Sequence, residues 1–121
     1  MSNPALHHKI TYIEFTTTDI AKTKKFYSTV FGWVFKDWGP DNIDCSVDIS
    51  GVSIGFTKGA PQQEPHDSAP FVVLYSKNLM ATEGDIIAAG GKIVVPTFEF
   101  PGVRRFHFSD GAGNLLGVWS E

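Results

Sequence analysis

The sequence has little of what would mark a special compartment. Cys45 is the only cysteine among 121 residues, so an intramolecular disulfide and a cysteine-based zinc cluster are both excluded. No run of about 18 apolar residues occurs, so we expect no membrane-spanning helix and no membrane partner. Residues 1–9 lack the apolar segment of a signal peptide. These absences together predict a cytoplasmic protein.

The chain also lacks a strong excess of charge. Ten Lys and Arg residues stand against 13 Asp and Glu residues, which gives a formal net charge of −3. The positive residues are scattered along the sequence and do not form a basic block. Nucleic-acid binding proteins usually carry a basic patch, so we expect no nucleic-acid partner.

Apolar and aromatic residues are plentiful. They include ten Phe, three Tyr and three Trp, and 42% of the chain is hydrophobic. This composition is typical of a globular protein, and the length fits one domain with a core of its own. So many rings must occupy a core, a pocket or an interface.

The first half of the sequence predicts one strand, one helix and three more strands. Residues 9–16 alternate between two faces, which indicates a β-strand. Residues 20–31 have apolar side chains at helical spacing, with Asp19 as the N-cap and Gly32 as the C-terminal stop. Turn residues then separate three short predicted strands, at residues 34–38, 44–49 and 52–57.

The same order begins again after a linker at about residues 59–70, which is rich in proline and polar residues. Residues 71–75 form a β-rich run, and Asn78 is the candidate N-cap of a helix over residues 79–89. Three strands are again predicted, at residues 92–95, 104–108 and 115–119.

The two halves also match residue by residue. A shift of 62 places Gly55 on Gly117 within similar apolar neighbours, and a shift of 59 places Tyr12 on Phe71. We interpret the chain as an internal duplication, in which each half buries one face against the other. The prediction is a single domain over residues 1–121, made of two tandem βαβββ modules at about residues 8–58 and 71–121.

Several segments together resemble the vicinal oxygen chelate superfamily of glyoxalases, bleomycin-resistance proteins and extradiol dioxygenases. They are FTTTDI (15–20), KFY (25–27), VFGW (30–33), GGKIVVP (90–96), PGV (101–103) and SDGAGNLLGVW (109–119). The sequence is most similar to the small members related to lactoylglutathione lyase. The resemblance implies an α+β fold, in which the two modules form a cup-shaped, curved mixed sheet with helices outside. It also implies a homodimer.

Metal-using members of that family place one ligand on the first and one on the fourth strand of each module. Carried onto this sequence, those positions fall on Tyr12, Gly55, Phe71 and Gly117. None of the four residues is a usual ligand of a divalent ion in this family, where imidazole, carboxyl and amide groups serve. We therefore expect no metal and no other cofactor.

The alternation of the strands predicts which side chains line the cup. Two glycines, Gly55 and Gly117, stand among large rings, and they are expected to leave open volume for a small-molecule ligand. The predicted ligand-binding residues are Tyr12, Phe71, Tyr75, Trp119, Gly55 and Gly117.

Three residues of the predicted cup have side chains that could take part in catalysis: Glu14, His107 and Arg105. If the protein is an enzyme related to lactoylglutathione lyase, Glu14 or His107 would abstract a proton in a lyase or isomerase reaction, while Arg105 stabilises an oxyanion. A simpler interpretation is a Glu14–Arg105 pair that only satisfies two charges.

Three alternatives to metal-free catalysis in the cup remain open. The first is sequestration of a small molecule without chemistry, of the bleomycin-resistance type. The second is an inert subunit whose rings fill a dimer interface. The third is a metal-dependent lyase or dioxygenase with atypical ligands. Fold alone does not decide among them.

Overall fold

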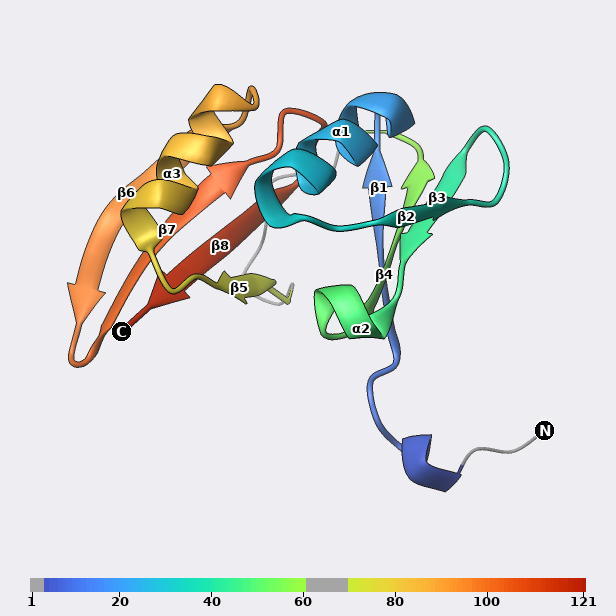
Figure 1. The fold of residues 1–121 in the computed structure, drawn as a ribbon, viewed down its shortest axis with the longest axis horizontal. Helices are drawn as coiled ribbons and strands as arrows, with labels where there is room; N and C mark the ends of the chain where they lie inside the picture. Colours follow the sequence, from blue (N-terminus) through green and yellow to red (C-terminus); the bar gives the residue numbers. More distant parts are fainter. Residues whose placement is uncertain (1–3, 61–69) are drawn as a thin grey trace.

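The computed structural model describes residues 4–60 and 70–121, arranged as two four-stranded sheets with helices packed on one side of them (Figure 1). Residues 61–69 of the predicted linker lie outside the described residues. A short 3-10 helix, η1 (Pro4–Leu6), lies on an N-terminal arm that extends away from the sheets. None of the helices in the described ranges is long and apolar enough to cross a membrane.

The first module contains one sheet, with the strand order β1-β4-β3-β2. The strands β1 and β4 are parallel, and the other pairs are antiparallel. Its elements are β1 (Tyr12–Thr17), α1 (Ile20–Phe31), β2 (Phe35–Asp37), β3 (Asn42–Cys45), α2 (Val47–Ser50) and β4 (Ser53–Lys58).

The second module repeats this arrangement, with the strand order β5-β8-β7-β6. Again the first and last strands of the module, β5 and β8, are parallel. Its elements are β5 (Val73–Tyr75), α3 (Leu79–Ala88), β6 (Lys92–Phe100), β7 (Val103–Ser109) and β8 (Leu115–Ser120). The equivalent topology confirms the predicted α+β fold of two βαβββ units.

Local capping explains where the two long helices begin. The side chain of Asp19 accepts a hydrogen bond from Lys22 N at 3.0 Å, and that of Asn78 accepts one from Ala81 N at 3.1 Å. Each cap satisfies a backbone N–H group that has no partner within its helix. Gly32 then ends α1 in the left-handed conformation, with φ at 72°, which costs glycine little.

The helix α1 joins the two sheets through aromatic packing. The ring of Tyr27 lies 5.0 Å from that of Phe56 in β4, and the ring of Phe26 lies 6.0 Å from that of Phe108 in β7. All four side chains are buried. The core is therefore shared between the modules, as expected for two units that bury their faces against each other.

A buried carboxylate fastens the turn between β7 and β8 to the first module. Asp110 accepts hydrogen bonds from the hydroxyl of Tyr27 at 2.9 Å, from Ala112 N at 2.8 Å and from both nitrogens of Asn114 at 3.1 Å. Asn114 Nδ2 also donates to the carbonyl oxygen of Thr16 at 2.8 Å. We refer to this group as the Asp110 clasp.

One predicted strand is wrong in extent. Residues 44–49 were expected to be extended, but β3 ends at Cys45 and α2 follows it. The carbonyl oxygen of Ser46 accepts hydrogen bonds from Ile49 N and Ser50 N, each at 3.1 Å. These bonds close a helical turn, so local hydrogen bonding overrides the weak preference of Val and Ile for strands.

The strand β6 is longer than predicted, because it continues through Pro96 to Phe100. Proline lacks the N–H group that a central strand would need. β6 lies at the edge of its sheet, and its register with β7 shifts between Ile93 and Val95 and again between Val95 and Phe98. These irregularities accommodate the proline.

Candidate functional site

Each sheet has one face turned away from α1 and α3, which we call its helix-free face. On β1, Tyr12, Glu14 and Thr16 are exposed, whereas the alternate residues Ile13 and Phe15 pack against the core. On the last two strands, the side chains packed in the core are Phe106, Phe108, Leu116 and Val118. The predicted cup residues therefore lie on the helix-free faces.

On the first sheet, the ring of Tyr12 covers Gly55. A Cβ atom built at Gly55 would overlap the phenol of Tyr12, whose hydroxyl donates to Glu14 Oε1 at 3.1 Å. Gly55 is aligned with Glu14 on one side and Asp44 on the other. Partial burial of the phenol is the main cause of the raised pKa of Tyr12, and the nearby carboxylates of Glu14 and Asp44 raise this pKa further. This face is therefore acidic around a phenol.

On the second sheet, the ring of Phe71 covers Gly117. A Cβ atom at Gly117 would lie 2.8 Å from Phe71 Cε2 and 3.4 Å from His107 Cδ2. The rings of Phe71 and His107 are 4.5 Å apart, and the guanidinium carbon of Arg105 lies 5.1 Å from the Phe71 ring centre. Phe71, Arg105 and His107 form one compact group, which we call the Arg105 cluster.

A hydrogen bond within the Arg105 cluster assigns the tautomer of His107. Arg105 Nε donates to His107 Nε2 at 3.0 Å, so the neutral imidazole carries its hydrogen on Nδ1. Partial burial, followed by the positive charge of Arg105, lowers the pKa of His107 from its ordinary value of 6.5. His107 is therefore neutral near pH 7 and holds the guanidinium in place.

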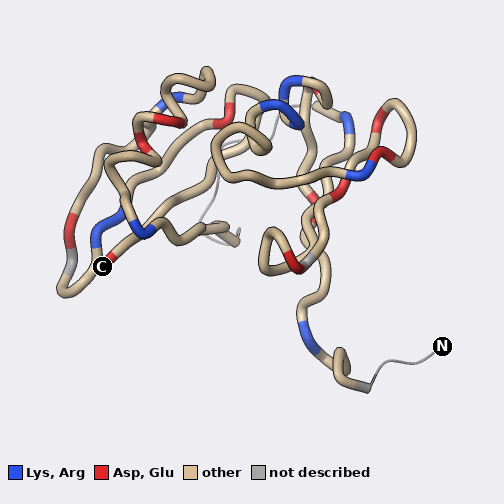
Figure 2. The backbone as a smooth tube through the Cα atoms, viewed as in Figure 1, with Lys and Arg blue, Asp and Glu red and all other residues tan. Residues whose placement is uncertain are grey.

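Arg105 has no counter-ion on the described chain. The one ion pair found in residues 4–60 and 70–121 joins Lys24 of α1 to Asp37 of β2. Figure 2 shows that the positions of the charged residues are dispersed along the chain. The terminal nitrogens of Arg105 are consequently left for solvent or for a bound anion.

The remaining predicted ligand-binding residues lie beside the Arg105 cluster. Trp119 is aligned with Arg105 on the neighbouring strand, and its ring lies 4.9 Å from that of Tyr75. The hydroxyl of Tyr75 donates to the carboxylate of Glu121, and this hydrogen bond is the main cause of the raised pKa of Tyr75. Tyr75 and Trp119 thus form an aromatic wall on the same face.

The structure corrects two expectations about the cup. The two glycines do not leave open volume, because rings from neighbouring strands occupy the space above them. Glu14 does not pair with Arg105 or meet His107, since it accepts from Tyr12 on the other sheet while Arg105 and His107 bond to each other. The three candidate catalytic groups are therefore not assembled into one centre.

The four positions that would hold a metal ion do not fit one. Tyr12 and Phe71 lie over the two glycines of the set, and only the phenol oxygen of Tyr12 could serve as a donor. Within the part of the chain that the structure describes, no three His, Cys, Asp or Glu side chains are grouped closely enough to bind a metal. A divalent ion needs several such donors.

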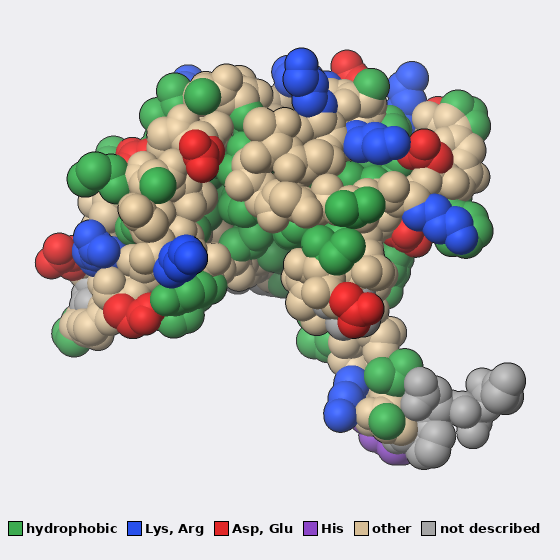
Figure 3. All heavy atoms as spheres, in the orientation of Figure 1, with side chains coloured by type: hydrophobic (Ala, Val, Ile, Leu, Met, Phe, Trp, Pro, Cys, Tyr) green, Lys and Arg blue, Asp and Glu red, His purple; other side chains and the backbone are tan. Residues whose placement is uncertain are grey.

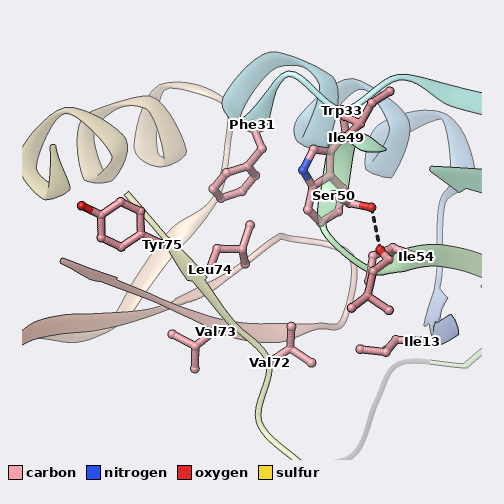
Figure 4. Close-up of a pocket in the computed structure, with 11 residues that line it drawn as sticks. Ile13, Phe31, Trp33, Ile49, Ser50, Ile54, Val72, Val73, Leu74 and Tyr75 are labelled. Atoms are coloured by element: carbon pink, nitrogen blue, oxygen red, sulfur yellow. Dashed lines mark hydrogen bonds between the residues drawn. The ribbon is translucent and has the colours of Figure 1, made fainter. Parts of the chain in front are cut away.

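A second concave feature lies where the modules meet. It is a cavity of about 480 Å³ below α1, lined mostly by apolar side chains, and Figure 3 shows hydrophobic side chains gathered in this hollow. Figure 4 shows the side chains around it, which come from both modules. The lining residues are Ile13, Phe31, Trp33, Ile49, Ser50, Val52, Ile54, Val72, Val73, Leu74 and Tyr75. We call it the junction cavity; sequence reasoning missed it.

Comparison with known proteins identifies the family. The sequence of residues 9–118 matches the family model of the Glyoxalase/Bleomycin resistance protein/Dioxygenase superfamily. The chain belongs to this superfamily. Among curated proteins, it is 25% identical over 114 residues to "Putative glyoxylase CFP32" of Mycobacterium bovis and of Mycobacterium tuberculosis. The match covers 89% of this chain but 44% of those relatives, so the chain spans less than half of their length.

Solved structures of superfamily members share the fold. A glyoxalase/bleomycin resistance protein/dioxygenase family enzyme from Burkholderia phytofirmans has a TM-score of 0.75 at 16% identity, covering 91% of this chain and 96% of that one. The fosfomycin resistance protein FosX from Listeria monocytogenes, in a complex with Mn(II) and 1S,2S-dihydroxypropylphosphonic acid, has a TM-score of 0.77 at 18% identity. That match covers 92% of this chain and 88% of FosX.

Proposed function

We propose that this glyoxalase-like protein binds a small organic anion on the helix-free face of its second sheet, without a metal ion. The observation that carries the proposal is the Arg105 cluster. It presents a guanidinium that His107 and Phe71 hold in place and that no carboxylate on the described chain neutralises. Guanidinium groups recognise carboxylates and related oxyanions through paired N–H groups.

The apolar surroundings indicate the rest of the ligand. Phe71, Tyr75 and Trp119 place aromatic surface next to Arg105, which suits an anion with a planar or apolar body. The first sheet places Glu14 and Asp44 around Tyr12, so its negative charge disfavours an anion there. FosX holds an organic phosphonic acid together with Mn(II); here Arg105 would supply the positive charge.

The geometry favours binding over proton abstraction. A general base needs a free acceptor within reach of the substrate proton, but His107 Nε2 already accepts from Arg105. Glu14 lies on the other sheet, bonded to Tyr12. Sequestration without chemistry therefore agrees with the structure better than a lyase or isomerase reaction.

The proposal is tested by calorimetric titration with benzoate and with benzamide, its neutral counterpart of similar shape. We expect benzoate to bind more tightly than benzamide, and Arg105→Gln to weaken benzoate roughly three- to tenfold, since the lost hydrogen bonds involve charged groups at a partly exposed site. The control is Arg104→Gln, which removes the same charge from the adjacent exposed residue. Equal losses in the two variants would refute a specific site.

We further propose that the protein acts as a cytoplasmic homodimer. Large apolar side chains remain exposed near the helix-free faces, with Tyr12 at 48%, Trp38 at 61% and Tyr75 at 51%, and a second copy would cover such surface. The single thiol, Cys45, is free and buried, which suits a reducing compartment. Light scattering coupled to size-exclusion chromatography tests the dimer, and a monomer at all concentrations would contradict it.

A further inference from the structure

We infer that the junction cavity is a second small-molecule site, which takes a compact apolar molecule carrying one hydrogen-bond acceptor. Its volume of about 480 Å³ falls within the roughly 300–1,000 Å³ that ligand pockets occupy. None of Arg105, His107 and Phe71 lines it, and Tyr75 is the one residue that it shares with the proposed anion site. The inference therefore does not depend on the proposed anion site.

The side chains that line the cavity are mostly apolar, although polar atoms also reach its surface. Ile13 and Ile54 come from the first sheet, Val72 and Leu74 lie in or beside β5, and Phe31 ends α1 (Figure 4). The hydroxyl of Ser50 is already hydrogen-bonded within the protein. Its single hydrogen is directed at the carbonyl oxygens of Val52, at 2.7 Å, and Ser46, at 3.0 Å. None of the lining residues carries a charge, so a charged ligand would lose its hydration without meeting a counter-charge here.

The indole N–H of Trp33 is a polar group that a ligand in the cavity could bind. This residue lines the cavity although it is only 6% exposed, and Figure 4 shows its nitrogen on the edge of the ring that faces Phe31. No hydrogen-bond acceptor for it is found among residues 4–60 and 70–121. Asn114 Oδ1 is the one buried side-chain nitrogen or oxygen without a partner among the described residues, so the Trp33 nitrogen is not sealed off by protein and is free to donate to a ligand carbonyl or ether oxygen.

The orientation of Trp33 is fixed by its neighbours. Its ring stacks on that of Tyr27 at 5.1 Å and lies 5.9 Å from that of Phe31 and 6.3 Å from that of Phe35. Because the indole is held on several sides, its N–H direction is set before a ligand arrives. Such preorganisation reduces the entropy lost on binding.

The probes are 1-indanone and indane, two rigid bicyclic molecules that differ in one carbonyl group. Binding is followed by calorimetry and by the indole resonances in ¹H–¹⁵N spectra of the full chain. We expect both probes to bind and 1-indanone to shift the Trp33 resonance. Trp33→Phe keeps an aromatic ring but removes the donor, so it should weaken 1-indanone about two- to tenfold and leave indane within about twofold.

A second variant tests the cavity without altering the donor. Ile49 is 43% exposed at the rim, so Ile49→Trp should fill the cavity and abolish binding of both probes. The control Met80→Trp adds the same ring at an 81% exposed position on α3 and should leave binding unchanged. Arg105→Gln should also leave 1-indanone binding unchanged, which separates this site from the anion site.

Three results would overturn the inference. One is an equal loss of 1-indanone and indane in Trp33→Phe, because the indole N–H would then contribute nothing. Another is unchanged binding in Ile49→Trp. The third is a fall in native mass from dimer to monomer in Ile49→Trp but not in Met80→Trp, which would show that a second copy of the chain covers the cavity.

Discussion

Asp110→Asn is expected to destabilise the protein substantially, because it breaks the Asp110 clasp. The carboxylate is 1% exposed and accepts four hydrogen bonds at 2.8–3.1 Å. The asparagine would keep most hydrogen bonds with its amide nitrogen in the place of Oδ2. There the hydroxyl of Tyr27 can rotate and accept a hydrogen bond from that nitrogen. Asn114 Nδ2 would then face a second N–H₂ group and lose its bond to residue 110.

The size of the effect follows from these contacts. A hydrogen bond to a charged group contributes about 1.5–3 kcal/mol, and a buried donor left unpaired costs about 1–3 kcal/mol. Removing the buried charge offsets part of this loss. We expect a decrease of about 2–3 kcal/mol in the free energy of unfolding, which at this chain length lowers Tm by roughly 10 °C. Tyr27→Phe removes one of the four bonds and should cost about 1–2 kcal/mol.

Urea unfolding followed by circular dichroism measures these differences, with Asp48→Asn as the matched control. Asp48 is exposed on α2, so its substitution should stay within about 0.5 kcal/mol of the parent protein. The double variant Asp110→Asn/Tyr27→Phe should cost less than the sum of the single changes, because the two groups share a bond. If Asp110→Asn cost no more than Asp48→Asn, the clasp would not hold the modules together.

The remaining predictions concern the Arg105 cluster. Gly117→Ala should displace Phe71, release Arg105 and weaken benzoate in calorimetry, whereas a fully retained affinity would contradict the packing. Because the pKa of His107 is lowered in the folded state, its contribution to stability is present above about pH 6.5 and is lost as the pH falls through that value toward the folded pKa. His107→Gln should remove this component from thermal-unfolding curves recorded between pH 5 and 8, and an unchanged profile would show that another group titrates. Glu14→Gln should change benzoate affinity less than about twofold, since Glu14 bonds to Tyr12 on the other sheet; a large loss would place Glu14 in the anion site.

The fold could be predicted from the sequence because its signals are local and repeated. Alternation placed Arg105 and His107 on one face of a strand and Phe106 and Phe108 on the other, and the burial of the two phenylalanines confirms it. The cap at Asp19 and the stop at Gly32 were equally local. The predicted strand ended at residue 95, before Pro96, whereas β6 continues through it. A proline is tolerated there because β6 is an edge strand, and the local sequence does not reveal the place of a strand in its sheet.

The site was less predictable because it depends on contacts across strands. Sequence could place Gly117 among rings, but only the rotamer of Phe71 decides whether the space is open or filled. The bond from Arg105 to His107 likewise depends on side-chain geometry within one strand. The junction cavity is built from both modules, and the sequence around Trp33 does not reveal that Leu74 and its neighbours in the other module line the same cavity.

Native mass spectrometry combined with metal analysis, on protein purified without a chelating tag, distinguishes an anion held by Arg105 from a metal-bound ligand. We expect a species with the added mass of a bound organic anion, no stoichiometric divalent metal, and loss of that added mass in Arg105→Gln but not in Arg104→Gln. A divalent metal bound stoichiometrically, with the added mass unaffected by Arg105→Gln, would refute metal-free anion binding and favour a metal-dependent lyase or dioxygenase.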